Sequence, residues 1–289
     1  MTGAILHLLD PKIKDLGEGF QVRRVLPAFE KRSVGPFVFF DHMGPVTLPP
    51  DGGLAVPPHP HIGLSTLTWL MDGEIMHRDS LGSVQLIVPG AVNWMTAGRG
   101  IAHSERRPPA WENKETRLHG LQVWLALPSD KQEIAPAFEH VPASDIPMID
   151  QSGVKIILVA GTGWGEESPV SVYAPTLFAD VQLSDDSVLE IPAEHEERAV
   201  YVTEGAVQLD GQSLTVGQMA VLRTGATPVL SCDQAARVAI IGGRPLALHR
   251  HMYWNYVSTD KARISKAHED WVAGRFASVI DDPAPNNMP

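Results

Sequence analysis

The sequence predicts an all-β protein of two similar β-barrels, with one short helix near the C-terminus. Three observations indicate this architecture. Between residues 36 and 127, short apolar or alternating runs are separated by turn signals rich in glycine and proline, which is typical of closely spaced strands. A second series of such runs begins at Val154. Short stretches of the two series resemble each other at offsets of 127 and 132 residues, which indicates an internal duplication.

The runs of the first series have the composition of strands. The segments 84–88 and 121–127 are rich in β-branched and large apolar side chains, which fit a barrel or a sandwich. Residues 131–152 contain several prolines and show no sustained periodicity, so we expect a connecting segment there. The predicted domains are therefore a first barrel in residues 1–130 and a second barrel, with the helix, in residues 153–289.

One amphipathic helix is predicted over residues 259–273. Ser258, Thr259 and Asp260 offer an N-cap, and Gly274 offers a stop. Between them, apolar or aromatic residues recur at helical spacing: Ile264, Ala267, His268, Trp271 and Val272.

The composition limits the classes of function. The chain has 289 residues, and 44% of them are hydrophobic, which is enough to bury a core. The formal net charge of −11 disfavours direct binding to nucleic acid phosphates, and no apolar run approaches membrane-spanning length. Cys232 is the single cysteine, so neither an internal disulfide nor a thiolate-rich metal site can form. We therefore expect a globular cytoplasmic protein that binds neither nucleic acid nor membranes.

Two short histidine motifs predict a metal site in the first barrel. His59-Pro60-His61 and His103-Ser104-Glu105 each place two ligand side chains at positions i and i+2. Alternate side chains of a β-strand point to the same face, so antiparallel neighbours could bring all four ligands to one ion. Three imidazoles and one carboxylate suit first-row divalent metals, especially iron(II). They leave two positions of an octahedral ion open for chemistry.

The alternative is that these are ordinary polar residues, because twelve histidines make chance pairs expected. We interpret His249-Arg250-His251 as such a pair. The first motif differs in its setting, since Pro57 and Pro58 stiffen its entry and a strand-like run follows Gly63. This context favours the metal interpretation.

The second barrel is predicted to lack a metal set. Carried across the offsets, the ligand positions become Ile191, Ala193, Leu230 and Cys232, which offer at most one soft ligand. His195 lies nearby among charged residues, and a solvated turn is its expected role.

Several other residues near the motifs have two interpretations. The groups Asp41-His42 and His77-Arg78-Asp79 either orient ligand imidazoles or form ordinary turns and hairpins. Trp69, Trp94 and Trp124 either line an aromatic pocket or fill the core, and their position on strands favours the core.

Longer motifs resemble the pirin family: Phe39-Phe-Asp-His-Met-Gly-Pro45, Pro58-His-Pro-His-Ile-Gly63, His77-Arg-Asp-Ser80 and Asn93-Trp-Met-Thr-Ala-Gly-Arg-Gly-Ile-Ala-His-Ser-Glu105. The likeness covers most of the chain. It implies a bicupin fold, which consists of two jelly-roll β-barrels in one chain, and a non-haem iron site in the N-terminal barrel. By motif, the implied metal ligands are His59, His61, His103 and Glu105, and no further cofactor-binding residues are implied.

The resemblance implies two kinds of function, because related proteins have been described as quercetin 2,3-dioxygenases and as regulators that act through protein partners. We expect an Fe(2+)-dependent dioxygenase that cleaves a flavonol-like aromatic substrate with O2. Ni, Cu, Mn, Zn and Co are the alternative metals. Glu105 is the predicted catalytic residue, which ligates the ion and accepts the substrate hydroxyl proton. The alternatives are a metal- or redox-sensitive regulator with a protein partner, and a bicupin whose metal only stabilises the fold.

Overall fold

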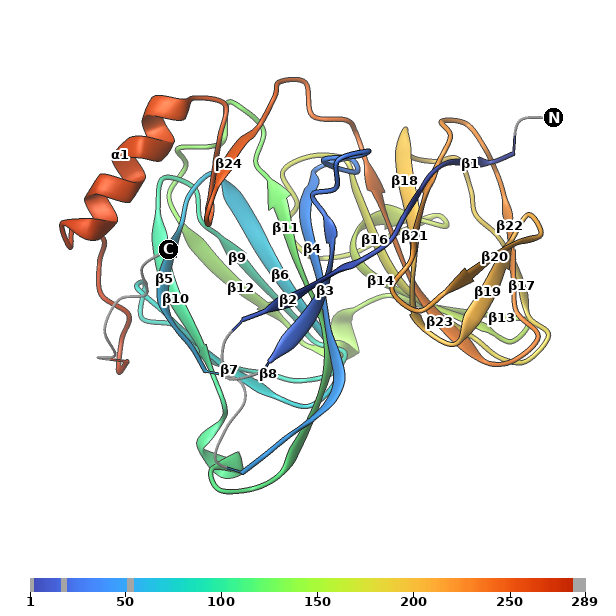
Figure 1. The fold of residues 1–289 in the computed structure, drawn as a ribbon, viewed down its shortest axis with the longest axis horizontal. Coiled ribbons are helices and arrows are strands. Elements are labelled where there is room, and N and C mark those ends of the chain that lie inside the picture. The colour runs from blue at the N-terminus through green and yellow to red at the C-terminus, as the bar shows by residue number, and fades with distance from the viewer. Residues whose placement is uncertain (1–2, 17–19, 51–54, 283–289) are drawn as a thin grey trace. The chain divides into compact units, whose positions relative to one another are not determined.

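The computed structural model describes residues 3–16, 20–50 and 55–282 and confirms the all-β, two-barrel architecture (Figure 1). Contacts between Cα atoms divide the chain into two compact units. We call one unit the histidine barrel; it comprises Lys14–Val22, Met43–Ala143 and Leu246–Pro289. We call the other the aliphatic barrel; it comprises Met1–Ile13, Arg23–His42 and Ser144–Pro245.

Two sheets form the layers of the histidine barrel. One sheet has the order β5 (Ala55–His61), β10 (Ile101–Arg106), β7 (Ile75–Asp79), β8 (Val84–Ile87). The other has the order β12 (Ala137–Val141), β9 (Val92–Thr96), β6 (Leu64–Asp72), β11 (Thr116–Ala126), β4 (Phe37–Leu48), β3 (Gln21–Leu26), β2 (Lys12–Asp15). The parts of its last three strands that fall within Met1–Ile13 and Arg23–His42 belong to the aliphatic barrel. The short elements η1 (Pro109–Trp111), β24 (His251–Tyr253) and β25 (Tyr256–Ser258) also belong to this unit.

The aliphatic barrel repeats this topology. Its smaller sheet has the order β17 (Val188–Glu190), β22 (Val229–Ser231), β19 (Ala206–Leu209), β20 (Gln212–Thr215). Its larger sheet has the order β1 (Ile5–Leu9), β21 (Met219–Leu222), β18 (Glu197–Glu204), β23 (Ala236–Gly243), β16 (Thr176–Leu183), β14 (Val154–Gly163), β13 (Met148–Gln151), and β15 (Glu166–Glu167) pairs with β14. The order β5-β10-β7-β8 therefore corresponds to β17-β22-β19-β20, which confirms the predicted duplication.

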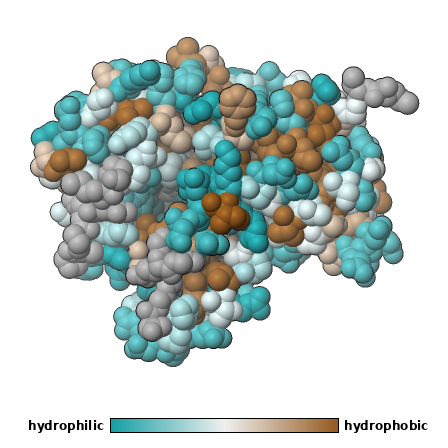
Figure 2. Space-filling view, in the orientation of Figure 1, coloured by the Kyte–Doolittle hydropathy of each residue, from teal (hydrophilic) through white to brown (hydrophobic). Residues whose placement is uncertain are grey.

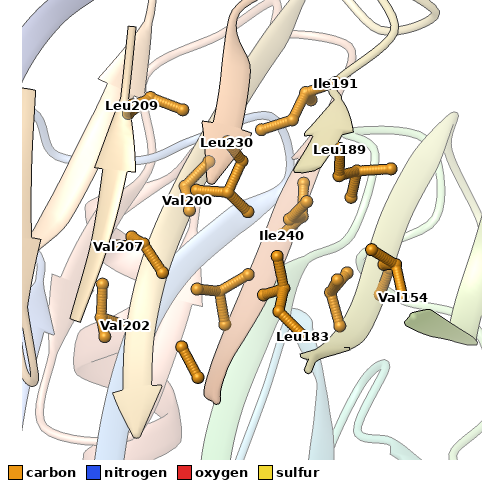
Figure 3. Packing of buried hydrophobic residues seen from close by; sticks show 14 of the residues in the cluster. Val154, Leu183, Leu189, Ile191, Val200, Val202, Val207, Leu209, Leu230 and Ile240 are labelled. Atoms are coloured by element: carbon orange, nitrogen blue, oxygen red, sulfur yellow. The ribbon is translucent and has the colours of Figure 1, made fainter. Parts of the chain in front are cut away.

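Alternate residues of these strands fill the interior of the aliphatic barrel with hydrocarbon. Figure 3 shows Val200 of β18 beside Leu230, and Val202 and Ile240 belong to the same cluster. These four side chains are fully shielded from solvent. Their period of two along β18 is the pattern that the sequence predicts for a strand with one face in the core.

The predicted C-terminal helix is confirmed as α1 (Lys261–Val272). The Asp260 carboxylate caps its first turn by accepting a hydrogen bond from the backbone N–H of Ala262 at 2.8 Å. Ile264, Ala267 and Trp271 are buried along one stripe. Val272 is 53% exposed, so it lies outside the buried stripe to which the sequence pattern assigned it.

The helix packs beside both histidine motifs. Ile264 and Ala267 share a buried cluster with Ile62, which follows the first motif. Trp271 shares another cluster with Ala102, which precedes the second motif. The helix therefore supports both ligand-bearing segments by burying the residues next to them.

The compact units do not follow the predicted sequential division. Helix α1 belongs to the histidine barrel, whereas β1, at the start of the chain, belongs to the aliphatic barrel and pairs with β21. The segment 131–152 is also more regular than a connection, since it contains β12, η2 (Ala143–Asp145) and β13. Its strands are short edge strands, which explains why it shows no sustained hydrophobic periodicity.

On the face drawn in Figure 2, hydrophobic residues lie interspersed with hydrophilic ones. Within the described residues, no helix combines the length and the apolar character needed to cross a lipid bilayer.

Gly63 joins the first histidine motif to β6 and permits the backbone to approach β25 closely. Its φ is +69°, and a Cβ at this position would lie only 1.9 Å from the carbonyl oxygen of Val257. The N–H of Gly63 donates to the carbonyl of Gly98 at 2.8 Å. Only glycine meets both the conformational and the steric demand of this turn.

We expect Gly63→Ala to lower the free energy of unfolding by ~3 kcal/mol or more, because a strained φ and a backbone collision act together. Gly82→Ala is the matched control. It shares a positive φ, +95°, but a Cβ there would meet nothing within 4 Å. Its cost should stay near ~1 kcal/mol, as measured by urea denaturation. Equal losses in the two variants would contradict the steric argument.

Candidate metal centre

Three histidines converge inside the histidine barrel. The antiparallel register of β5 and β10 places His103 opposite His59 and Ile101 opposite His61. Nε2 of His61 lies 3.1 Å from Nε2 of His103. One ring nitrogen from each of the three histidines lies within 4.8 Å of the others, and all three side chains are buried. The structure thus brings together the three histidines that the sequence singled out.

These distances fit a shared metal ion. Ligand atoms that sit about 2.0–2.1 Å from one ion lie roughly 2.9–3.4 Å from each other in octahedral or tetrahedral geometry. The separation of 3.1 Å between the two Nε2 atoms falls within that range. His61 and His103 are therefore spaced as two ligands of one metal would be, and a ring nitrogen of His59 lies within 4.8 Å of both.

The environment keeps the three imidazoles neutral, which is the form that ligates metals. Burial lowers the pKa of His59 to about 4. Burial and then the neighbouring His59 lower the pKa values of His61 and His103 well below the usual value. Nδ1–H of His59 donates to the backbone carbonyl of Pro57 at 2.9 Å, so its Nε2 keeps a free lone pair.

A buried chain of hydrogen bonds orients His103. Nδ1 of His103 lies 3.4 Å from Nδ1 of His77, and Nε2 of His77 lies 3.2 Å from the carboxylate of Asp79. A carboxylate can only accept, so His77 donates from Nε2, and its Nδ1 accepts the proton of His103 Nδ1. This tautomer directs the Nε2 lone pair of His103 toward the other histidines.

Asp79 is itself held in place, because its other oxygen accepts backbone hydrogen bonds from Leu81 at 2.8 Å and Ser83 at 3.0 Å. Burial alone would raise the pKa of Asp79, but the hydrogen bonds from His77 and Ser83 outweigh burial and lower it. An ionised Asp79 therefore orients His77, which in turn orients the ligand histidine His103. The orienting role considered for the group 77–79 agrees with these contacts.

The group Asp41-His42 has other partners. The Arg24 guanidinium donates to both Asp41 oxygens at 2.8 Å, and Nδ1 of His42 lies 3.0 Å from the Tyr201 hydroxyl. These residues belong to the aliphatic barrel, and the partners named here are not the ligand imidazoles.

Of the tryptophans considered for an aromatic pocket, Trp124 contacts the site. Its ring centroid lies 5.2 Å from that of His61 in an edge-on arrangement. Trp69 and Trp94 are buried, and Nε1 of Trp94 donates to the Thr96 hydroxyl at 3.1 Å. The core interpretation therefore fits these two, whereas Trp124 borders the histidines.

Glu105 lies on the same strand as His103 but outside the three-histidine group. A register shift between His103 and Glu105 interrupts the pairing of β10 with β5, and such a bulge re-aims the side chain that follows it. Burial raises the pKa of Glu105, while the neighbouring His77 and the Thr68 hydroxyl, 3.5 Å from Oε1, act in the opposite direction. Its role as the fourth ligand stays a prediction.

A row of four polar residues faces this site from the larger sheet. Direct cross-strand pairing links His140 to Asn93, Asn93 to Thr68, and Thr68 to Gln122. The Thr68 hydroxyl donates to Oε1 of Gln122 at 2.6 Å. Directly opposed residues of an antiparallel pair share one face, so the row crosses β12, β9, β6 and β11 on a single side of the sheet.

Asn93 carries an unsatisfied donor within this row. Nδ1 of His140 donates to Oδ1 of Asn93 at 2.8 Å. Nδ2 of Asn93 is buried and has no hydrogen-bond partner among the residues that the structure describes. A buried donor without an acceptor costs about 1–3 kcal/mol. Sequence reasoning missed this row, because no local motif reveals which residues of four separate strands lie opposite one another.

The aliphatic barrel has hydrocarbon where the histidine barrel has its ligands. Leu230 pairs with Leu189, as His103 pairs with His59. Buried aliphatic or thiol side chains of one core line the corresponding strands β17, β22 and β19 and the residues after β17 and β22: Leu189, Ile191, Leu230, Cys232, Val207 and Leu209. Figure 3 labels all of these except Cys232.

Two of the predicted correspondences do not fit one another in this pairing. Ile191 and Leu230 are the predicted counterparts of His59 and His103, which pair directly, but Leu230 pairs with Leu189. The loops between the strands differ in length, since β5 ends only three residues before β6 begins, whereas β17 and β18 are separated by the loop 191–196. A single offset therefore cannot place both strands.

His195 in that loop is more buried than expected. It is 8% exposed, and its Nε2–H donates to the backbone carbonyl of Thr162 at 2.9 Å. The expected solvated turn is thus a packed one, because this backbone contact draws the ring inward.

Comparison with known proteins places these observations in a family. A family model described as Pirin matches residues 19–125, and one described as Pirin C-terminal cupin domain matches residues 178–277. A pirin-like protein of Caulobacter vibrioides is 45% identical over 272 residues, which cover 93% of each chain. A Pseudomonas aeruginosa protein named "putative quercetin 2,3-dioxygenase" is 41% identical over 93% of this chain and 84% of its own.

A solved structure extends the likeness to the whole fold. The crystal structure of a quercetin 2,3-dioxygenase from Acinetobacter baumannii is 37% identical in sequence and superposes with a TM-score of 0.92. The match covers 99% of this chain and 95% of that one.

We expect His59→Ala to abolish metal binding, because it removes one of the three converging imidazoles. The measurement is the metal content of folded, nickel-loaded protein by elemental analysis. His249→Ala is the control, since it removes one ring of the other histidine pair, whose centroids lie 4.7 Å apart. Full occupancy in a variant that carries both His59→Ala and His103→Ala would refute the site.

We also expect a single ion per chain. The aliphatic barrel offers Leu189, Ile191 and Leu230 at the corresponding positions, and none of these side chains can ligate a metal. Elemental analysis should give the same stoichiometry for wild type and His195→Ala. Two ions per chain, with one lost on that substitution, would contradict this expectation.

Proposed function

This chain belongs to the pirin family, and from that premise we propose that it is an iron(II)-dependent dioxygenase that cleaves a flavonol-like substrate with O2. One observation carries the proposal: three buried, neutral imidazoles converge in one barrel, with a carboxylate on the same strand as one of them. Two of the similar proteins carry the name quercetin 2,3-dioxygenase, one of them as a putative one.

The donor set fits a first-row divalent ion. We assign His59, His61, His103 and Glu105 as the ligands, three nitrogens and one carboxylate oxygen, a set that suits iron. A bound iron(II) would supply open positions for substrate and O2 and a net charge of about +1 after one carboxylate is counted, which attracts an anionic oxygen. Nickel, copper, manganese, zinc and cobalt share these ligand preferences, so the metal content after purification says little about the native ion.

The protein's own residues hold the ligands and move the proton. His77 and Asp79 keep His103 in the tautomer that exposes its Nε2 lone pair. The carbonyl of Pro57 does the same for His59. Rigid, preoriented ligands reduce the rearrangement that substrate binding requires.

We assign a second role to Glu105 as the acceptor of the substrate hydroxyl proton. It is half-buried, and the Thr68 hydroxyl 3.5 Å from Oε1 is its neighbour on the opposite sheet. A carboxylate bound to a metal is a weak base, so this role requires that it loosen from the ion as it takes the proton.

The surroundings suit an aromatic substrate. Trp124 presents its ring beside His61, and Phe138 stacks on His77 with centroids 4.5 Å apart. Flat aromatic ligands pack well against such faces and edges.

We place the protein in the cytoplasm, since a single cysteine is typical of reducing compartments.

We expect protein loaded anaerobically with iron(II) to consume O2 and release carbon monoxide when a flavonol such as quercetin is added. Glu105→Gln should lower the turnover rate by about 10²- to 10⁴-fold, the usual contribution of a positioned proton acceptor, and lower metal occupancy far less. An oxygen electrode and elemental analysis measure the two effects.

Glu190→Gln, an exposed carboxylate on β17 of the aliphatic barrel, is the matched control and should leave turnover unchanged. If no flavonol supports O2 uptake or carbon monoxide release, the dioxygenase proposal fails. A protein partner whose affinity depends on the metal would then support the regulator, and loss of folding stability alone on chelation would support a purely structural metal.

A further inference from the structure

We propose that Asn93 donates a hydrogen bond to an oxygen atom of the ligand bound at the histidine site, which makes it a specificity-determining residue. The inference rests on the proposed function for the class of ligand, an oxygenated aromatic compound. The structure supplies the donor atom Nδ2, the orientation of the Asn93 amide and the face of the sheet on which it lies. His140 acts as a positioning residue, because it contacts Asn93 rather than the ligand.

His140 fixes which end of the Asn93 amide is available. Nδ1 of His140 lies 2.8 Å from Oδ1 of Asn93, and an amide oxygen can only accept. The amide oxygen is therefore occupied, and both N–H groups of Nδ2 are turned away from His140. Asn93 is 4% exposed, and within the described residues Nδ2 has no partner.

Three contacts between the sheets show that the face of Asn93 looks toward the histidines. Phe138 of β12 stacks on His77. Thr68 of β6 reaches Glu105, and Trp124 of β11 borders His61. Asn93 pairs directly with Thr68 and lies on β9, between β12 and β6, so its side chain belongs to the same inward face.

The aliphatic barrel shows that this fold does not itself require a polar row. The strands corresponding to β9, β6 and β11 are β21, β18 and β23, and there the paired residues are Ala220, Val200 and Ile240. All three are buried in one hydrocarbon core. Asn93 lies where the aliphatic barrel has Ala220, so the fold itself does not require an amide there. The unsatisfied donor of Asn93 therefore points to a ligand.

The free donor specifies the chemistry of its partner. Two N–H groups require an acceptor, such as a carbonyl oxygen, a hydroxyl oxygen or a deprotonated hydroxyl. A hydrogen bond to a charged oxygen is stronger than one to a neutral oxygen. Asn93 should therefore favour ligands that present an anionic oxygen beside the metal over ligands that bind the metal through nitrogen.

The test compares two metal-binding probes on anaerobic, nickel-loaded protein. 3-Hydroxyflavone offers a hydroxyl and a carbonyl oxygen, whereas imidazole offers only nitrogen. Asn93→Leu should raise the dissociation constant of 3-hydroxyflavone by about ten- to a hundredfold, the loss expected for a hydrogen bond to a charged group. The dissociation constant of imidazole should stay unchanged. Calorimetric titration measures both dissociation constants, and elemental analysis confirms equal nickel content.

Further variants separate this role from a structural one. Asn93→Asp keeps the acceptor for His140 but replaces the donor by a negative charge, so it should lower the affinity for 3-hydroxyflavone at least as much as Asn93→Leu does. His140→Leu should lower this affinity less than Asn93→Leu. His140→Gln, which can still donate to Oδ1, should restore the affinity. Gln208→Leu, an amide replaced on β19 of the aliphatic barrel, is the control and should change nothing.

Equal affinity of wild type and Asn93→Leu for 3-hydroxyflavone would overturn the inference, as would an equal loss for both probes or no binding by wild type. Failure of the proposed function is a separate result. If Asn93→Leu weakens 3-hydroxyflavone selectively while iron-loaded wild type consumes no O2 with any flavonol, the donor role stands and the dioxygenase proposal falls.

Discussion

The register of β5 against β10 is the constraint on which the candidate site depends. Because side chains alternate along a strand, a slip of one residue would turn His59 and His61 to the face opposite that of His103. Gly63 limits how the chain leaves the first motif, and α1 buries Ile62 and Ala102 beside the two motifs. The histidines therefore meet because turn geometry and packing outside the strands leave the pairing little freedom.

The two barrels show how one topology accommodates opposite interiors. In the aliphatic barrel, Leu189, Leu230 and Val207 fill the centre, and burial of their hydrocarbon stabilises the unit. In the histidine barrel the same places carry groups whose desolvation is unfavourable unless they are hydrogen-bonded. The chain of contacts from Asp79 through His77 to His103 meets that need. Functional chemistry is thus concentrated in one copy, while the other is a hydrocarbon-filled scaffold.

The features that could be predicted from the sequence are those encoded locally. The period of two in β18, the N-cap of α1 at Asp260 and the two histidine motifs each lie within a few residues of sequence. The row from His140 to Gln122 escaped prediction because it depends on the pairing of four strands. The exchange of β1 and α1 between the units also escaped it, since segments far apart in sequence form these contacts.

The place of α1 in the histidine barrel has a consequence for biosynthesis. A ribosome releases residues 43–143, with all three histidines, long before it releases residues 246–282, which complete the same unit. Until then, the apolar residues Ile62 and Ala102 lack the helix that covers them. A nascent or prematurely terminated chain therefore displays the ligands on an unfinished barrel. A metal held by these histidines would therefore depend on a segment that is translated well after them.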